Sequence, residues 1–397
     1  MKVLFLTHRV PYAPNRGDRI RAFHVIRTLA PRVELDVVSL AHDRAELAQA
    51  DSIKDAGVRV SAFLVPRLRN RLKALGYLAG ARPLTHALLD APGLLPSVRE
   101  LIRERPPDVV LAYCSSMARF ALEEPLSHYP LVIDLVDVDS VKWAALAERA
   151  AAPKRWIYRR EARLLASFER EAATKARVTL VVNEREQGEL QTIAPGAAVR
   201  VLPAGVDAAA LQPPEAPTVQ PRVVFCGVLN YEPNVEGILW FAREVWPLVR
   251  ARRPDATFSI VGSTPTGSIR QLTTRQSGIE VTGTVPDVRP YLWRAAVSIA
   301  PLLTSRGVQT KALEAVAAGL PVVMTSAVSG GLPSEIGPAS RIADSPETFA
   351  SHVVDLLERS GPERRSIAGS ADLSGLSWES RLAPLYQILA EASGAAR

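Results

Sequence analysis

Short apolar runs rich in β-branched residues alternate along this chain with longer stretches whose apolar residues recur at helical spacing. The runs predict strands, in chain order, at Val3–Thr7, Val33–Leu40, Val58–Val65, Asp108–Ala112, Leu131–Leu135, Val178–Val182, Val199–Leu202, Arg222–Cys226, Thr257–Val261, Ile279–Gly283, Val297–Pro301 and Pro321–Thr325. The stretch Val235–Val249 is typical of the helices between them, with one apolar face made by Ile238, Phe241, Val245 and Val249. This alternation predicts α/β domains with parallel sheets covered by helices on both faces.

A Pro-rich segment divides the chain. Ala208–Pro221 holds four prolines, which disfavour both a helix and a central strand. A length of 397 residues also favours two domains. We therefore predict an N-terminal domain over residues 1–207, a linker over 208–221, a C-terminal domain over 222–375, and a helix with a tail over 376–397. Ligands of such sheets bind beyond the carboxyl ends of the strands, so we expect the active site in the cleft between the domains.

Two further helices are predicted near the domain ends. Arg159–Ala176 is charged and amphipathic, and we interpret it as a surface helix before the strand Val178–Val182. Trp378–Ala392 is a second amphipathic pattern, followed by a frayed tail.

Composition excludes several classes of protein. Hydrophobic residues make up 47% of the chain and charged residues 22%, as in globular proteins. Cys114 and Cys226 are its two cysteines, which excludes a disulfide scaffold and a Cys-rich metal site. The opening MKVLFLTHRVPY predicts a strand and not a signal peptide, and no apolar run approaches the ~20 residues of a membrane span. We therefore expect a cytoplasmic protein.

The net charge of +7 raises the question of an anionic partner. Aromatic residues make up 6% and do not interleave with basic ones, so we expect no nucleic acid. The segment Ala56–Leu89 holds several basic residues and no acidic one, and within it Leu68, Leu72, Leu75 and Ala79 follow helical spacing. Such a helix either lies on an anionic membrane surface or packs on its own domain with solvated arginines.

Two loops contain candidate anion-binding groups. The loop after the first predicted strand holds Gly17 directly before a helix, with Arg16, Arg19 and Arg21 beside it. A glycine at a helix start lets backbone N–H groups approach a phosphate, although a plain turn with solvated arginines explains the pattern equally.

In the second half, Thr304–Glu314 follows the strand Val297–Pro301 and opens a helix. A phosphate is favoured at this helix entrance, where Lys311 can neutralise a diphosphate and Glu314 can accept hydrogen bonds from vicinal hydroxyls. An exposed Lys–Glu pair three residues apart is the alternative.

The stretch GVQTKALEAVAAGLPVV resembles the donor-binding segment of family 4 glycosyltransferases of the GT-B fold. Other stretches resemble this family in the same order along the chain: LTHRVPYAPNRGDRIRAFHVIRTLA, LVVNEREQGEL, VRVLPAGVD, VVFCGVLNYEPNVEGILWFAREVWP, FSIVGSTP and VTGTVPDVRPYLWRAAVSIAPL. The opening and YEPNVEGILWFA are most similar to sugar transferases of bacterial exopolysaccharide clusters.

The resemblance implies two doubly wound Rossmann-like domains facing a central cleft, with a C-terminal helix that crosses back to the N-terminal domain. It implies a retaining transfer of a sugar from a nucleotide-sugar donor to a glycan or lipid-linked acceptor, without a metal or a cofactor. Lys311 would contact the diphosphate and Glu314 the ribose. The implied donor-binding residues are Gly17, Arg19, Gly227, Asn230, Gly262, Val285, Arg306, Gly307, Val308, Gln309 and Thr310.

The chain departs from the family pattern at three places. The family commonly has two Glu separated by seven residues; Glu314 matches the second, but Arg306 stands at the first. The Arg and Lys that often follow the first strand of the C-terminal domain are missing from Val228–Asn234. Where the family often has a His, this chain has Asp137.

Asp137 belongs to the acidic run Asp134–Ser140 at the carboxyl end of a predicted strand. Alternation in an extended chain would place Asp137 and Asp139 on one side, where one of them could orient an acceptor hydroxyl or accept its proton. We assign this catalytic role to Asp137. Asp139 or Ser140 is predicted to cap the following helix.

The sequence and the resemblance therefore predict a cytoplasmic GT-B glycosyltransferase, and the basic segment leaves open whether it is peripheral at the inner membrane face. A nucleotide-sugar epimerase of the same fold is one alternative. The missing Glu and the missing Arg and Lys also suit a non-catalytic partner that binds nucleotide sugars and supports an active transferase.

Overall fold

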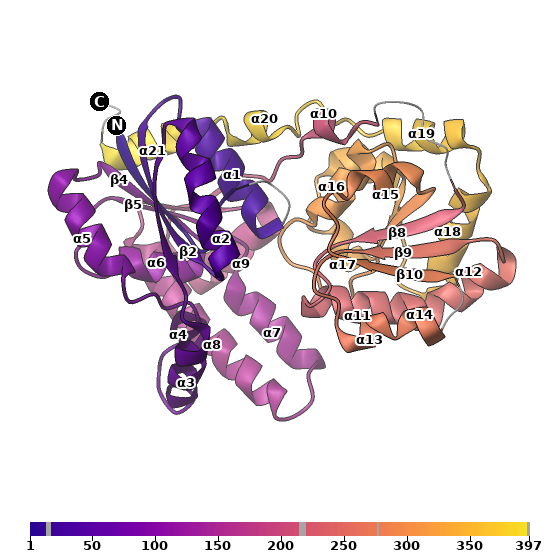
Figure 1. The fold of residues 1–397 in the computed structure, drawn as a ribbon, viewed down its shortest axis with the longest axis horizontal. Helices are drawn as coiled ribbons and strands as arrows, with labels where there is room; N and C mark the ends of the chain where they lie inside the picture. Colours follow the sequence, from indigo (N-terminus) through magenta and orange to yellow (C-terminus); the bar gives the residue numbers. More distant parts are fainter. Residues whose placement is uncertain (13–16, 214–219, 276–277, 395–397) are drawn as a thin grey trace. The chain divides into compact units, whose positions relative to one another are not determined.

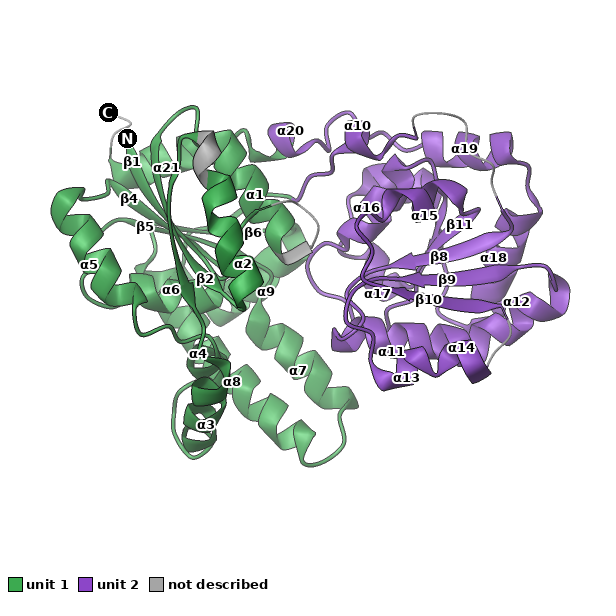
Figure 2. Ribbon diagram, viewed as in Figure 1, with its two compact units in different colours: residues 1–203, 381–397 green, residues 204–380 purple. Residues whose placement is uncertain are grey.

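The computed structural model describes residues 1–12, 17–213, 220–275 and 278–394 (Figure 1). The chain divides into two compact units (Figure 2). Unit 1 comprises Met1–Pro203 together with Arg381–Arg397, and unit 2 comprises Ala204–Ser380. Unit 1 is therefore discontinuous in sequence, whereas unit 2 is one continuous segment.

The described part of unit 1 is built on a seven-stranded parallel sheet in the order β3-β2-β1-β4-β5-β6-β7. Its strands are β1 (Lys2–Thr7), β2 (Glu34–Ala41), β3 (Arg59–Leu64), β4 (Val109–Tyr113), β5 (Leu131–Val136), β6 (Val178–Val181) and β7 (Val199–Val201). Its helices are α1 (Gly17–Leu29), α2 (Arg44–Ala48), the 3₁₀ segment Gln49–Ala56, α3 (Arg67–Tyr77), α4 (Leu84–Leu88), α5 (Leu94–Glu104), α6 (Ser115–Ala121), α7 (Asp139–Arg149), α8 (Lys154–Lys175), α9 (Glu184–Ile193) and α21 (Leu385–Ser393).

The described part of unit 2 contains a six-stranded parallel sheet in the order β10-β9-β8-β11-β12-β13. Its strands are β8 (Arg222–Cys226), β9 (Thr257–Val261), β10 (Ile279–Gly283), β11 (Val297–Ala300), β12 (Val322–Met324) and β13 (Ser340–Ile342). Its helices are α10 (Ala208–Leu211), α11 (Glu232–Trp240), the π-helical turn Phe241–Val245, α12 (Trp246–Arg252), α13 (Gly267–Arg270), α14 (Leu272–Arg275), α15 (Arg289–Arg294), α16 (Thr310–Ala317), α17 (Ser326–Ser329), the 3₁₀ turn Ser334–Ala339, α18 (Pro346–Glu358) and α19 (Gly361–Gly369). The helix α20 (Trp378–Leu382) spans the boundary between the units.

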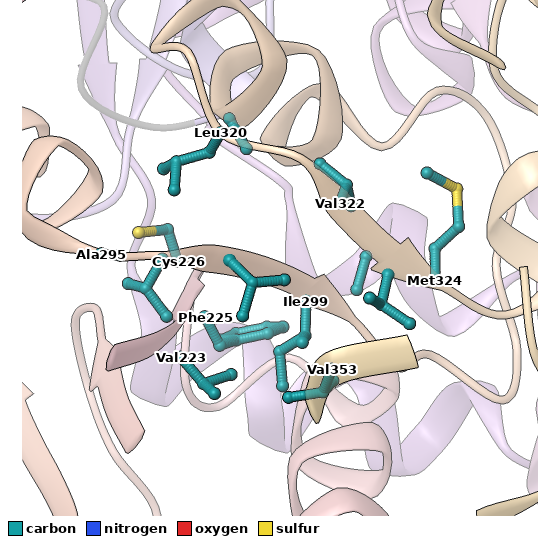
Figure 3. Close-up of a cluster of buried hydrophobic side chains, with 14 of the residues drawn as sticks. Val223, Phe225, Cys226, Ala295, Ile299, Leu320, Val322, Met324 and Val353 are labelled. Carbon is teal, nitrogen blue, oxygen red and sulfur yellow. The ribbon is translucent and has the colours of Figure 1, made fainter. Parts of the chain in front are cut away.

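Apolar side chains from both faces of the unit 2 sheet form its core (Figure 3). Phe225 of β8, Ile299 of β11 and Val353 of α18 are fully buried there, which explains the near-continuous apolar character of these strands. The predicted apolar face of Val235–Val249 is confirmed, because Ile238, Phe241, Val245 and Val249 are all buried.

Every predicted strand is present, with each end within one residue of its predicted position. The predictions missed β13, because its three residues Ser-Arg-Ile carry no apolar run. The predicted C-terminal crossing is confirmed at the level of the units: α21 packs on β4 and β5 of unit 1, and buries Leu385 and Leu389.

The domain boundaries differ from their predicted positions. Unit 2 begins at Ala204, and Ala208–Leu211 forms the short helix α10 inside the segment predicted to be a linker. This helix ends before Pro213, and Gln212 ties it to unit 2 by donating to the carbonyl of Ala317 at 2.7 Å. Residues 214–219 of the predicted linker lie outside the described residues.

Residues 376–380, predicted as the start of the C-terminal helix and tail, also belong to unit 2. Leu376 is buried in the core of unit 2, and its carbonyl accepts from the amide of Val206 at 2.8 Å. The single predicted helix Trp378–Ala392 is instead two helices, α20 and α21.

Helix α8 contributes buried carboxylates to unit 1. It begins at Lys154 and buries Glu161 and Glu169, so the prediction of a surface helix was wrong for one face. Glu161 accepts from the amides of Leu84 and Thr85, both at 2.8 Å, and from the Thr85 hydroxyl at 2.7 Å. It therefore satisfies the free N–H groups at the start of α4 from a distant part of the chain.

We expect Glu161→Ala to lower the free energy of unfolding by about 2–3 kcal/mol, because three half-buried donors would lose their acceptor. The matched control is Glu171→Ala on the same helix, where Glu171 forms an exposed ion pair with Lys175. That control should change stability by less than about 0.5 kcal/mol. Urea denaturation followed by circular dichroism measures both changes, and equal midpoints for the two variants would contradict this role of Glu161.

Candidate functional site

The strand order of unit 2 identifies where a ligand would bind. The chain proceeds from β8 to β9 and β10 on one side, and then returns to β11 on the other side of β8. The connections after β8 and β11 therefore diverge at the carboxyl edge of the sheet, which is the place where open α/β sheets bind ligands. Gly227 follows β8, and Pro301–Gln309 follow β11.

Two of the predicted glycines lie in close backbone contact at this edge. A Cβ on Gly262, which follows β9, would lie 1.7 Å from the carbonyl oxygen of Gly227. A Cβ on Gly227 would lie 3.0 Å from Nδ2 of Asn234. Glycine is therefore required at residue 262 to bring the two connections together. Because neither glycine has a side chain, a ligand can approach the backbone closely at this edge.

Asn234 links the start of α11 to this edge. It is buried, and its Nδ2 donates to the carbonyl of Val228 at 2.9 Å. Its Oδ1 accepts from Nζ of Lys311 at 2.8 Å. The sequence analysis placed Asn234 only at the end of the stretch that lacks the Arg and Lys, and its partnership with Lys311 was not predicted.

Lys311 lies in the first turn of α16 and points back toward β8. Its Nζ also donates to Oε1 of Gln309 at 3.0 Å and lies 5.2 Å from the ring centroid of Phe225. Burial lowers the pKa of Lys311 to about 8, although the nearby Glu314 carboxylate acts to raise it. This ammonium is held by neutral amide oxygens, which leaves it able to exchange them for an anion.

The alternative of an exposed Lys–Glu surface pair is not what the structure shows. Among the described ion pairs, none joins Lys311 to Glu314. The pKa of the Glu314 carboxyl lies above its ordinary value, because burial raises it more than the charge of Lys311 lowers it. Cys226 lies beside both, and burial raises the pKa of its thiol to about 12, so it stays protonated.

The segment before α16 forms a tight turn. Gly307 has a φ of +60°, a conformation that favours glycine, and Gln309 donates to the carbonyl of Arg306 at 3.1 Å. The structure thus brings Arg306–Thr310 to the same edge as Gly227, Gly262 and Lys311. Asn230 is exposed, and Val285 follows the edge strand β10, where it packs on the core.

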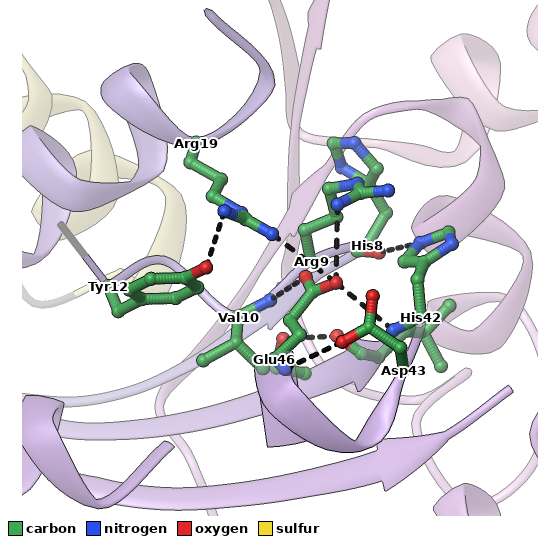
Figure 4. A network of polar contacts seen from close by, with 10 residues as sticks. His8, Arg9, Val10, Tyr12, Arg19, His42, Asp43 and Glu46 are labelled. Atoms are coloured by element: carbon green, nitrogen blue, oxygen red, sulfur yellow. Dashed lines mark hydrogen bonds and ion pairs between the residues drawn. The ribbon is translucent and has the colours of Figure 1, made fainter. Parts of the chain in front are cut away.

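In unit 1 the strand order changes direction between β1 and β4, so the connection after β1 lies at the corresponding position. Gly17 is the first residue of α1, and Arg16 lies outside the described residues. Arg19 is buried: its Nη1 donates to the Tyr12 hydroxyl at 2.7 Å and its Nη2 lies 3.4 Å from Glu46 (Figure 4).

Arg21 is also engaged within unit 1. Its Nε donates to Asp134 at 2.7 Å, and its Nη2 donates to the carbonyl of Leu202 at 2.9 Å. Glu46 and Asp134 therefore compensate the positive charge that the sequence placed on this loop. A donor contact of Arg19 stays a prediction.

The acidic run after β5 does not follow the predicted alternation. Val136 has a φ of +69°, and the amide of Asp137 donates to the carbonyl of Leu135 at 2.9 Å, which closes a γ-turn. Helix α7 then begins at Asp139, so the chain is not extended between the two aspartates. The strained turn at Val136 is of the kind that clusters at functional sites.

The predicted helix cap at Asp139 or Ser140 is wrong. The free amides at the start of α7 are satisfied by buried carboxylates, with Val138 donating to Glu186 at 2.9 Å and Ser140 to Glu169 at 3.2 Å. Asp139 instead accepts from the Ser115 hydroxyl at 2.6 Å and from Lys142.

The pKa values of Asp137 and of the acidic side chains near it are shifted in different directions. Burial raises the pKa of Asp137 to about 6, with Lys142 acting to lower it and Asp139 to raise it. Although burial acts to raise the pKa of Asp139 as well, Lys142 and Ser115 hold it below its ordinary value. Burial raises the pKa of Glu169 to about 8. Asp137, whose side chain is 25% exposed, is thus a carboxylate poised to exchange a proton near neutral pH.

The described ranges 1–12, 17–213, 220–275 and 278–394 contain no group of three or more His, Cys, Asp or Glu side chains placed to hold a metal ion. They also contain no helix whose length and apolar character would let it cross a membrane.

The sequence analysis did not find Asn234, Lys142 or the buried glutamates. Asn234 and Lys142 each follow a predicted strand and lie within one or two turns of the start of the next helix. This position is a usable signal for site residues in such folds. The glutamates lie in charged helical stretches, and nothing in their spacing distinguishes them from solvated residues.

Comparison with known proteins agrees with this geometry. Residues 220–359 match the family described as "Glycosyl transferases group 1". An uncharacterized 44.6 kDa protein in the cps region of Klebsiella pneumoniae is 26% identical over 141 residues. This match covers 34% of the chain and about a third (36%) of the length of that relative.

Several solved structures are similar over almost the whole chain. Sucrose-phosphate synthase from Thermosynechococcus elongatus has a TM-score of 0.72 at 15% identity, with 100% of both chains covered. Anabaena HepE in complex with UDP and glucose has a TM-score of 0.69 at 15% identity, covering 98% of this chain and 100% of that one. WaaG, a glycosyltransferase involved in lipopolysaccharide biosynthesis, has a TM-score of 0.65 at 17% identity, covering 96% and 99%.

The chain therefore has the GT-B fold, with two Rossmann-like units built on parallel sheets, as the resemblance implied. The family match of residues 220–359 lies in unit 2, the unit that carries Lys311 and the paired glycines.

We expect Gly262→Ala to lower the free energy of unfolding of unit 2 by about 2–4 kcal/mol, because the new Cβ would force the connections after β8 and β9 apart. Gly267→Ala is the matched control, since a Cβ there meets nothing within 4 Å. Thermal unfolding of both variants measures the difference. An unchanged melting temperature in Gly262→Ala would mean that the two connections are not in close contact.

Proposed function

We propose that this protein is a glycosyltransferase that moves a sugar from a nucleotide-sugar donor, with retention and without a metal, to a glycan or lipid-linked acceptor. We further propose that it acts in the synthesis of a bacterial exopolysaccharide or cell-surface glycan, in the cytoplasm at the inner membrane face. The family match of residues 220–359 supports the reaction class. The complex of HepE with UDP-glucose and the cps region of the Klebsiella relative support the donor and the pathway class.

The observation that carries the proposal is the position of Lys311. It lies at the carboxyl edge of the sheet where the connections after β8 and β11 diverge, and its ammonium is held by the amide oxygens of Asn234 and Gln309. A donor diphosphate in this position would replace the amide oxygens as the partner of the charge. Transfer of the sugar leaves negative charge on the departing diphosphate, and a preorganised cation there stabilises the transition state.

The other site residues take roles that fit their surroundings. Glu314 lies on α16 three residues beyond Lys311 and is available to accept from the ribose hydroxyls. Gly227 and Gly262 let the nucleotide approach the backbone closely. The turn Arg306–Gln309 would contact the sugar and phosphates, with Arg306 replacing the usual Glu as a cation.

Asp137 would serve the acceptor in unit 1. It stands beyond the strained turn at the end of β5, beside Lys142. Its raised pKa gives it enough basicity to orient an acceptor hydroxyl and take up its proton.

Lys311→Ala should weaken binding of the donor nucleotide about tenfold to a hundredfold, since a charge-assisted contact is lost. Titration calorimetry or thermal shift with UDP, GDP, TDP and their sugar conjugates measures this change. Lys175→Ala, which removes an exposed lysine from unit 1, is the control. Tight binding of a nucleotide that Lys311→Ala leaves unchanged would remove Lys311 from the donor site.

Nucleotide affinity should also depend on pH. The pKa of Lys311 in the free protein is about 8, and a diphosphate favours the charged form. Affinity should therefore be full below about pH 8 and decrease as the pH rises above it, by up to about tenfold per unit. Lys311→Ala should lose that part of the pH dependence, whereas a wild-type affinity that is flat from pH 7 to about pH 9 would contradict the assignment.

Asp137→Asn should lower turnover by about a hundredfold or more if Asp137 acts as the base. In the wild type, turnover should decrease by about tenfold per unit as the pH falls below about 6, because the carboxylate becomes protonated. Glu148→Gln on α7, the helix that follows Asp137, is the control and should retain both the rate and the pH profile.

Product analysis in the same assays separates the competing functions. A new glycosidic bond with the anomeric configuration of the donor supports the proposal. Epimerised nucleotide sugar without a glycoside would identify an epimerase, and nucleotide-sugar binding without turnover in the presence of membranes and acceptors would identify a non-catalytic partner.

A further inference from the structure

Helix α3 (Arg67–Tyr77) presents its leucines to solvent. Leu68, Leu72 and Leu75 are 75%, 64% and 64% exposed, which is unusual for large apolar side chains grouped on one helix. Their spacing of four and three residues places them on one side of the helix, and we call this group the leucine face. Buried apolar packing against unit 1 therefore does not explain the amphipathic pattern of this helix.

The opposite side of α3 fixes its orientation. Asn70 and Ala74 are the buried residues of the helix. Nδ2 of Asn70 donates to the carbonyls of Leu88 at 3.1 Å and Asp90 at 2.8 Å, and Lys73 forms an ion pair with Asp90 at 2.7 Å. These contacts hold the leucine face outward, so its exposure is a property of how the helix is anchored.

Basic residues border the leucine face. With about 100° between successive residues of a helix, Arg69 and Arg71 fall on either side of the three leucines. Both arginines are exposed, and the whole segment 56–89 lacks Asp and Glu. An apolar stripe between cations matches a surface that is apolar inside and anionic at its boundary, which describes a leaflet containing anionic lipids.

A further exposed apolar residue, Trp156, lies on a helix that contacts the segment after α3. Arg160 of α8 donates to the carbonyls of Gly80 at 2.6 Å and Arg82 at 3.1 Å, so α8 packs on the segment that follows α3. Trp156, about one turn earlier on α8, is 58% exposed and is preceded by Lys154 and Arg155. Figure 1 shows α3 and this end of α8 projecting from the same side of unit 1. Tryptophan beside basic residues is a common membrane-interface anchor.

We propose that the leucine face of α3, bordered by Arg69 and Arg71 and assisted by Trp156, docks unit 1 on an anionic phospholipid surface. The leucines enter the boundary between headgroups and acyl chains, and the arginines contact lipid phosphates. This inference rests on the proposed membrane location and names the surface of unit 1 that would contact the membrane. Docking by this surface requires neither a donor nor an acceptor. Its test is therefore independent of the proposed glycosyltransferase activity.

The test is cosedimentation of the full chain with vesicles of phosphatidylcholine alone and of phosphatidylcholine mixed with phosphatidylglycerol. We expect the partition coefficient to be at least about tenfold higher on the anionic vesicles, and to decrease as salt screens the arginines. Leu68→Gln, Leu72→Gln and Leu75→Gln combined should lower binding to the anionic vesicles by at least about tenfold. Arg69→Gln with Arg71→Gln should reduce the preference for the anionic vesicles.

Leu248→Gln is the matched control, because Leu248 is 38% exposed on α12 of unit 2 beside Arg250 and Arg252. It should bind vesicles as the wild type does. All these side chains are exposed, so thermal melting should be unchanged and loss of binding cannot be loss of fold. Trp156→Gln should weaken binding by a smaller factor than the three leucine changes.

Three outcomes would overturn the proposal. The first is equal, negligible binding of the wild type to both kinds of vesicle, and the second is wild-type binding by the triple leucine variant. The third is a dimer in sedimentation velocity without lipid that the triple leucine variant dissociates while vesicle binding is absent. That result would assign the leucine face to a second copy of the chain.

Discussion

Buried glutamates that accept from backbone amides hold the strand-to-helix connections of unit 1 in place. Glu46 accepts from the amides of Val10 and His42, at 3.1 and 3.2 Å, and so joins the connections after β1 and β2 (Figure 4). Glu161 does the same for the start of α4, and Glu186 and Glu169 for the start of α7. A buried amide without a partner is costly, so each connection depends on a carboxylate supplied from a helix of the same unit.

This arrangement explains why the acidic run after β5 presents carboxylates, whereas the region around Lys311 presents an ammonium. In unit 1, Glu169 and Glu186 take over the capping of α7, which leaves Asp137 and Asp139 free for Lys142, Ser115 and solvent. In unit 2, closely packed glycine backbones and one neutral amide, Asn234, hold a single ammonium. One unit thus concentrates carboxylates at its carboxyl edge, and the other holds a cation there, which suits the roles proposed for Asp137 and Lys311.

The sequence predicted the strands well because parallel strands buried on both faces leave apolar runs that need no partner to be recognised. That Lys311, Glu314 and the two glycines lie in one region was also predictable, since strand ends and a family resemblance locate them together; their roles stay predictions. The roles of Glu46, Glu161 and Glu169 were not predictable, because a charged residue in an amphipathic helix looks alike whether it faces solvent or a distant loop. For α3, the spacing of Leu68, Leu72 and Leu75 predicted a stripe, but only the anchoring of Asn70 decides that the stripe points outward. The direction in which the stripe points depends on contacts with residues far along the chain, and the periodicity of the sequence carries no information about those contacts.

The discontinuity of unit 1 also sets an order of events during synthesis. Unit 2 is continuous over residues 204–380, so all of it is synthesised before α21 is made. Until then β4 and β5 lack the helix that buries Leu385 and Leu389 against them. Part of the sheet of unit 1 therefore stays uncovered while the whole of unit 2 is translated, and unit 1 is completed only when the chain returns to it with α21.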